Sequence, residues 1–268
     1  MTAPLPEFEN PPLVETVLGV QFDPLPDLTA FHLGVFWASM GSEWPIIAEG
    51  PTLGQTAEPT AFDDVWTAPG PRFPISSATP LRLRGFNSTR DRGFQVENGW
   101  LVLNWRKGAG SYPRYAHLRP EFARLFERFV AFIAEQGLGE VRPNLFEIGY
   151  INAIPKDGLW TDVGGWHGVL PGLVGSSART SMGSLQTMNG RWVFDLGQHR
   201  GRLHVNLSHA KDDHGGEVLL LRMTARGPVQ VPGLAGWSSG LDLGHEAIVR
   251  SFSDLTSLKA HELWRRCS

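Results

Sequence analysis

The segment Phe94–Arg106, FQVENGWLVLNWR, predicts two antiparallel strands joined by a tight turn at Asn98-Gly99. Asn and Gly tolerate the positive φ angles of a type I′ turn, whose twist matches that of the strands it joins. A second segment, Leu185–Gly197 (LQTMNGRWVFDLG), repeats this order around Asn189-Gly190. Two hairpins of the same design predict that the chain contains a duplicated, sheet-forming unit.

Each half of the chain predicts a strand, a helix, three or four further strands and a longer helix. In the first half, the expected strands are Leu13–Phe22, Phe62–Trp66, Leu81–Thr89, Gly93–Glu97 and Trp100–Arg106, with helices at Ala30–Met40 and Arg119–Gln136. In the second half, the expected strands are Leu145–Pro155, Arg179–Met188, Arg191–Gly197, Arg202–Ala210 and Glu217–Arg226, with a short or irregular helix in Trp160–Gly175 and two helical pieces in Leu243–Trp264.

This order predicts an α+β fold in which duplicated β-α-β(3-4)-α units form a largely antiparallel sheet with helices packed on one face. The halves are expected at residues 1–140 and 141–268, packed as one continuous domain. The topology resembles the TATA-box-binding-protein-like fold. A likeness of fold carries no function with it.

The charge is distributed unevenly along the 268 residues. The formal net charge of −3 gives nucleic acid no general attraction to the whole chain. Residues 1–81 hold ten acidic residues against Arg72 alone, whereas residues 82–128 hold ten basic residues against four acidic ones. The segment 82–128 is therefore either a solvated face that balances the acidic segment or a basic binding surface.

Cysteine content and hydropathy bear on the compartment. Cys267 is the only cysteine, so no disulfide can form within the chain and a cysteine-based metal site is not expected. No apolar run approaches the roughly 20 residues of a membrane span. We therefore expect a cytoplasmic protein without a membrane partner.

The clearest candidate for binding is Tyr112-Pro113-Arg114-Tyr115, which lies between the first hairpin and the helix after it. Two of the three tyrosines flank Arg114, and the third is Tyr150. Tyr and Arg are enriched at binding hot spots because each combines contact area with hydrogen bonding. The alternative is that this loop only anchors the chain on the helix.

A row of polar side chains is the second candidate. In the strand Arg202–Ala210, the residues His204, Asn206 and Ser208 alternate with apolar ones, so they share one face. In the first half, Leu101, Leu103 and Trp105 share one face of the strand Trp100–Arg106, and Val102 and Asn104 the other. A polar row on an open sheet is either solvated or a recognition surface.

Evidence for catalysis and for metal or cofactor binding is sparse. No nucleophile elbow, phosphate loop, HExxH motif or dinucleotide fingerprint is present. His199, His204, His209 and His214 follow one another at five-residue steps, which do not converge on one side of a strand or helix. We expect no cofactor and no metal.

Three short motifs resemble a family of bacterial proteins of about this length. They are Asn10-Pro11-Pro12-Leu13-Val14-Glu15-Thr16-Val17, Leu103-Asn104-Trp105 with Tyr112–Tyr115, and the closing Phe252, Leu255-Thr256, His261 and Trp264. The family is sporadically distributed and functionally uncharacterised. The resemblance implies a cytoplasmic bacterial protein and supplies no catalytic residues.

Three functions are compatible with these patterns. The first is a non-catalytic binding or adaptor protein that recognises a protein, a second copy of itself or a small molecule. Its expected site residues are Tyr112, Arg114, Tyr115, Trp105, Asn104, His204, Asn206 and Ser208. The second is an enzyme with a site between the halves and His204, Glu147 or His209 as acid–base groups. The third, nucleic-acid binding, would use Arg82, Arg84, Arg90, Arg92, Arg106, Lys107 and Arg114.

Overall fold

The computed structural model describes residues 4–50, 53, 82–108, 110–175, 181–212, 214–231 and 236–267. Its strands are β1 (Leu13–Phe22), β2 (Ile46–Gly50), β3 (Arg82–Phe86), β4 (Arg92–Glu97), β5 (Trp100–Arg106), β6 (Pro143–Pro155), β7 (Gly190–Asp195), β8 (Arg202–Lys211) and β9 (Glu217–Pro228). Its helices are α1 (Ala30–Ser39), α3 (Tyr115–Glu135), α4 (Gly236–Leu255) and α5 (Leu258–Leu263), with 3-10 turns η1 (Gly41–Glu43) and η2 (Val163–Gly168). The predicted strand at 62–66 lies outside the described residues.

All nine strands form one antiparallel sheet in the order β2-β3-β4-β5-β1-β6-β9-β8-β7. The first strands of the two predicted halves, β1 and β6, pair with each other at the centre. The last strand of each half, β5 or β9, lies next to this pair, and the earlier strands follow outward to the edges β2 and β7. The prediction of a mixed fold with a large antiparallel sheet is confirmed.

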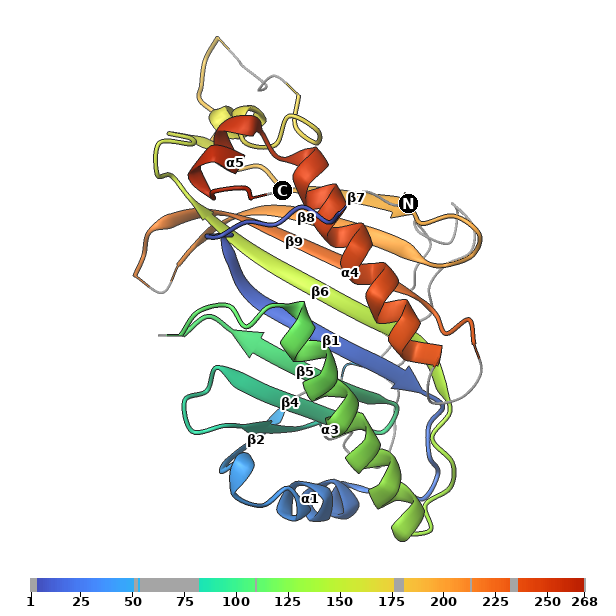
Figure 1. Cartoon of the computed structure of the whole chain (residues 1–268). Helices are drawn as coiled ribbons and strands as arrows, with labels where there is room; N and C mark the ends of the chain where they lie inside the picture. The colour runs from blue at the N-terminus through green and yellow to red at the C-terminus, as the bar shows by residue number, and fades with distance from the viewer. Residues whose placement is uncertain are drawn as a thin grey trace.

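Helices α3 and α4 cross the same face of this sheet, which we call the helix face; the opposite side is the far face (Figure 1). The α3 helix buries an apolar stripe formed by Phe122, Leu125, Phe126, Phe129, Phe132 and Ile133. Phe129 lies 5.3 Å from both Phe22 of β1 and Phe36 of α1, measured between ring centroids. These edge and tilted contacts fix α1 and α3 to the sheet.

The α4 helix approaches the sheet closely because two of its residues lack a side chain. A Cβ atom at Gly240 would lie 2.3 Å from Phe146, and one at Gly244 would lie 2.5 Å from Ile148. Both partners belong to the helix face of β6. The glycines that lower helix propensity here are therefore required by the packing.

The prediction of a second hairpin, around Asn189-Gly190, is wrong for the described residues. Asn98-Gly99 does join β4 to β5, and the side chain of Asn98 hydrogen-bonds both the amide and the carbonyl of Leu25 at 2.8 Å. Residues 181–189, in contrast, form no strand, so Asn189 precedes β7 without closing a hairpin. An Asn-Gly pair permits a turn, but a hairpin also needs a partner strand.

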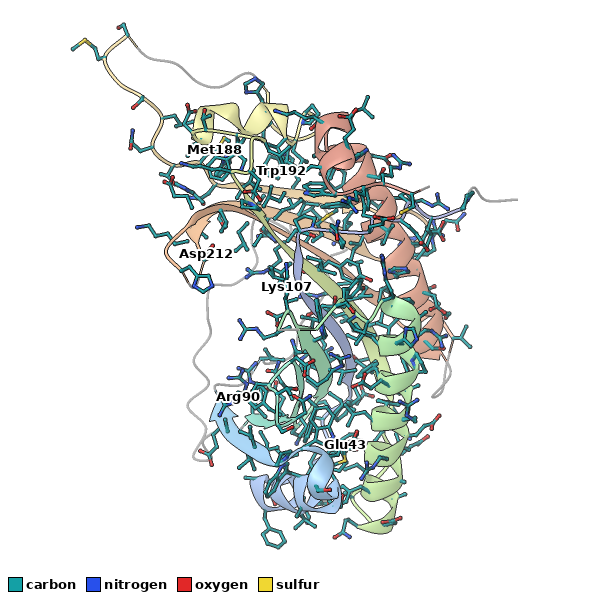
Figure 2. The ribbon with its side chains drawn as sticks, turned by 60° about the vertical axis from the view of Figure 1, so that its left-hand side comes forward. Glu43, Arg90, Lys107, Met188, Trp192 and Asp212 are labelled. Atoms are coloured by element: carbon teal, nitrogen blue, oxygen red, sulfur yellow. The ribbon has the colours of Figure 1, made fainter. Side chains whose placement is uncertain are left out.

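The far face is not uniformly polar. Trp100, Val102 and Leu145 form a buried cluster there, next to Val17. Lys107 and Arg90 lie on the side turned away from α3 and α4 (Figure 2). Among the described helices, none has the length and apolar character needed to cross a membrane.

Candidate functional site

The Tyr112–Tyr115 segment leads from β5 into the first turn of α3, on the helix face. Arg114 precedes the helix with φ 65° and ψ 153°. This backbone conformation is adopted almost only by glycine and costs on the order of 1–3 kcal/mol in other residues. The segment therefore holds an arginine where glycine would be less strained, and such strain is typical of functional positions.

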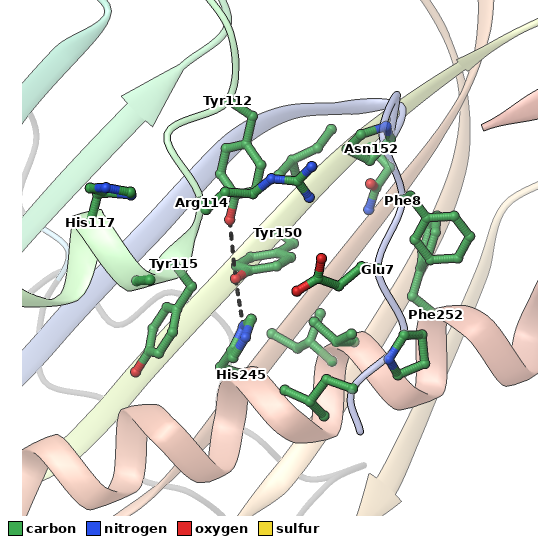
Figure 3. A pocket seen from close by; sticks show the side chains of 17 residues that line it. Glu7, Phe8, Tyr112, Arg114, Tyr115, His117, Tyr150, Asn152, His245 and Phe252 are labelled. Carbon is green, nitrogen blue, oxygen red and sulfur yellow. Dashed lines mark hydrogen bonds between the residues drawn. The ribbon is translucent and has the colours of Figure 1, made fainter. Parts of the chain in front are cut away.

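The three tyrosines of the chain meet at this point. The Tyr112 hydroxyl donates to the Tyr150 hydroxyl at 3.3 Å, and the Tyr150 oxygen lies 2.7 Å from Nδ1 of His245 (Figure 3). Tyr115 stacks on the His245 ring at a centroid distance of 4.0 Å and an angle of 12°. Residues from the segment between β5 and α3, from the start of α3, from β6 and from α4 thus form one connected cluster.

The outer part of the cluster is held by Asp242. Its carboxylate accepts a hydrogen bond from the Tyr115 hydroxyl at 2.7 Å. It also accepts two from the Arg119 guanidinium, at 2.7 and 2.9 Å. A bidentate pair of this kind fixes orientation as well as distance. It joins α3 to α4 beside the stacked Tyr115 and His245 rings.

Burial keeps the cluster uncharged. It raises the pKa of Tyr112, of Tyr115 and of Tyr150 above that of free tyrosine. Burial also lowers the pKa of His245 to about 4, although Asp242 and Glu246 oppose this shift. The Tyr150 hydroxyl accepts from Tyr112 and can donate its own proton to Nδ1 of a neutral His245, whose ring proton is then on Nε2.

A cavity of about 380 Å³, which we call the tyrosine pocket, adjoins this cluster. Its apolar walls are Leu5, Pro6, Phe8, Pro11, Leu13, Ile248, Val249 and Phe252, and its polar groups are Glu7, Tyr112, Arg114, Tyr115, His117, Tyr150, Asn152 and His245. The Arg114 side chain passes over the Tyr112 ring, 5.9 Å from its centroid, and extends into the pocket (Figure 3).

One wall of the tyrosine pocket is the segment that precedes β1. Backbone hydrogen bonds hold it to the end of the chain, from Glu9 to Arg265 and from Asn10 to Trp264, both at 3.1 Å. The Phe8 ring packs edge-on against Phe252, 5.6 Å away. The pocket is therefore built from both predicted halves and from both terminal segments.

The remaining predicted site residues do not join this pocket. Trp105 is buried in the core, where its ring supports Tyr112 at 5.0 Å. Asn104 lies on the far face, donates to Glu15 at 3.0 Å and accepts from Gln95 at 2.6 Å. His204, Asn206 and Ser208 are also on the far face, because Leu203, Val205 and Leu207 of the same strand point into the core. The predicted set is thus divided between the two faces of the sheet.

The acid–base residues considered for an enzyme are also separated. Glu147 pairs with Arg226 on the far face. His204 lies on the same face but across strand β9. His209 lies on the helix face, its ring 5.6 Å from that of Trp166 and its Nε2 atom 3.4 Å from Glu217. It lines a second cavity, of about 690 Å³, beside η2.

The basic residues considered for nucleic-acid binding occupy both faces as well. Arg92 bonds Glu121 of α3 on the helix face at 3.3 Å. Arg106 lies 3.7 Å from Glu15 on the far face. Arg114 belongs to the tyrosine pocket. Arg90, Arg106 and Lys107 thus lie on the far side and Arg92 and Arg114 on the helix face, so the seven residues do not all share one face (Figure 2).

Sequence reasoning missed three parts of the site. The sequence gives no signal that Tyr150, His245 or the wall residues Leu5–Phe8 belong to a binding site. No sequence signal placed His245 opposite Tyr150, because that contact depends on the course of α4. Within the described ranges, no group of three or more His, Cys, Asp or Glu residues is arranged to hold a metal ion.

Comparison with known proteins gave no assignment. No family model matches the chain, and neither a curated protein nor a solved structure matches it significantly.

Proposed function

We propose that this chain is a non-catalytic binding protein. It holds in the tyrosine pocket a small molecule that has one anionic group and an apolar body. The observation that carries the proposal is the convergence of Arg114 and all three tyrosines around a largely apolar cavity. Ligand pockets typically combine apolar walls with a few convergent polar groups. Arg114 would pair with the anionic group, and the apolar walls would cover the body of the ligand.

The protonation states favour binding over catalysis. Tyrosines whose pKa is raised stay protonated at neutral pH, and a histidine whose pKa is about 4 is a weak base. Efficient general acid–base groups have pKa values near the working pH. The cluster therefore offers a ligand fixed hydrogen-bonding groups and no group poised to transfer a proton.

Other expectations accompany this proposal. The same strand order on both sides of the β1–β6 pair, with the last strand of each half innermost, supports a duplication with halves at 1–140 and 141–268. Membership of the bacterial family rests on the three motifs quoted above. A cytoplasmic location rests on the single cysteine, which leaves no disulfide to form within the chain.

The test is a titration with anilinonaphthalene sulfonate, an aromatic anion whose fluorescence rises in apolar surroundings. We expect saturable one-to-one binding to the wild type and at least a tenfold weaker affinity for Arg114→Ala. Arg142→Ala is the matched control, because Arg142 pairs with Glu140 in its own loop and does not line the pocket. Equal affinity for the wild type and Arg114→Ala, with both proteins folded by near-ultraviolet circular dichroism, would refute the proposed site.

A further inference from the structure

Strand β7 is an edge of the sheet that carries little protection against pairing. Among the described strands it pairs only with β8, so no described strand bonds the backbone groups on its other side. Natural edge strands are usually shielded by proline, charged side chains, a bulge or a covering segment. The sequence of β7, GRWVFD, contains no proline, its two charges (Arg191 and Asp195) are of opposite sign, and Phe194 exposes 40% of its surface.

The side chains of β7 divide cleanly between the two faces. Trp192 and Phe194 lie opposite Val205 and Leu203 of β8, whose side chains belong to the core, so both aromatic residues are on the helix face. Arg191, Val193 and Asp195 are consequently on the far face. Arg191 and Asp195 are both exposed, and neither forms an ion pair with a described residue.

We propose that β7 is a self-association surface that pairs antiparallel with β7 of a second copy of this chain, on a twofold axis through Val193. In this register, Arg191 of each copy lies directly opposite Asp195 of the other. Trp192 of each copy likewise lies opposite Phe194 of the other, on the helix face. Directly opposed residues share a face of an antiparallel pair, and both opposite charges and aromatic pairs stabilise it.

The alternative registers lack this complementarity. A shift that brings the axis to Trp192 places Arg191 opposite Val193, and a shift to Phe194 places Asp195 opposite Val193. Either shift leaves the charges of β7 without opposite charges across the pair. The spacing of Arg191, Val193 and Asp195 therefore selects one register, and the result is a sheet that continues across both copies with all helices on one side.

Charge reversal tests this arrangement directly by sedimentation equilibrium. The wild type is expected to form a dimer. Arg191→Glu places acidic groups opposite each other and Asp195→Arg places basic groups opposite each other, so each variant alone is expected to dimerise at least tenfold more weakly. An equimolar mixture of the two variants restores both ion pairs and is expected to form a one-to-one heterodimer.

A second pair of variants covers the case in which Asp195→Arg does not fold, since Asp195 also accepts a hydrogen bond from the Gly197 amide at 3.0 Å. Val193→Glu and Val193→Arg each place like charges on the axis, and their mixture places opposite ones there. Heterodimers in the mixtures but weak homodimers of each variant would support the proposal. A wild type that stays monomeric, or variants that dimerise as the wild type does, would overturn it.

Discussion

The hydroxyl of Tyr150 lies 2.7 Å from Nδ1 of His245, and this contact joins the central strand β6 to helix α4. The same hydroxyl accepts a hydrogen bond from Tyr112, which follows β5. The contact therefore links parts of the chain that are about a hundred residues apart, at the place where the tyrosine pocket opens. Its loss should affect both stability and binding.

Tyr150→Phe is expected to lower the free energy of unfolding by about 1–3 kcal/mol, because Nδ1 of His245 and the Tyr112 hydroxyl lose a buried partner. Denaturant unfolding measures the change. Tyr115→Phe is the comparison, since its hydroxyl bonds the exposed Asp242 and its removal should cost less. A larger loss for Tyr115→Phe would contradict the assigned hydrogen-bond chain.

His245 should make stability depend on pH. Burial lowers its pKa to about 4 in the folded protein, against roughly 6.5 in an unfolded chain. The unfolded state then binds a proton at higher pH than the folded state does. The contribution of His245 to the free energy of unfolding is therefore fully present above pH 6.5 and is lost as the pH falls toward 4.

The expected loss is about 3 kcal/mol, at roughly 1.4 kcal/mol per pKa unit. The neighbours that face His245 are Tyr115, Tyr150, Asp242 and Glu246. The pKa of His261 is also lowered, chiefly by burial, and contributes in the same direction. The variant His245→Gln isolates the effect of His245. The free energy of unfolding of this variant should fall less between pH 7 and pH 4 than that of the wild type. Identical pH profiles for the wild type and His245→Gln would contradict the assignment.

Arg114→Gly should separate stability from binding. The substitution relieves the positive φ angle of Arg114 and should raise the free energy of unfolding by about 1 kcal/mol. It also removes the guanidinium from the tyrosine pocket, so the affinity for anilinonaphthalene sulfonate should fall. A variant that is less stable than the wild type would show that the backbone at this position is not strained.

Gly240→Ala tests the close approach of α4 to the sheet. The added Cβ would lie 2.3 Å from Phe146, so we expect a loss of about 1–3 kcal/mol from overpacking. Gly34→Ala, within helix α1, has no atom within 4 Å of the added Cβ. It should instead stabilise the protein by roughly 0.5–1 kcal/mol. Thermal unfolding of the two variants should therefore shift in opposite directions.

Much of the sheet could be predicted from the sequence. Strand β1 has the predicted bounds Leu13–Phe22, and the Asn98-Gly99 turn is where its sequence signal placed it. Local alternation and turn chemistry decide such elements. The β7–β8–β9 strands also follow their predictions closely, since their alternation of apolar and polar residues is regular.

The helix boundaries and the site depend on tertiary contacts. Helix α3 begins at Tyr115, a turn before the predicted Arg119, although no side chain of Arg114 caps it. Helix α4 begins at Gly236, seven residues before the predicted Leu243, because its glycines serve the packing on β6. Leu258, an apolar residue, is nevertheless 77% exposed at the start of α5. The contact of His245 with Tyr150 depends on the packing of α4 on β6, so the sequence alone could not predict it.

The central claim is that the three tyrosines line one ligand pocket, and nuclear magnetic resonance of protein labelled with 13C only in its tyrosine rings tests it most directly. The chain has three tyrosines, so every labelled signal reports on this pocket. Titration with anilinonaphthalene sulfonate should shift all three signals along one binding curve, and Arg114→Ala should move that curve to higher concentration. Saturable binding that leaves the three signals unmoved would contradict the account.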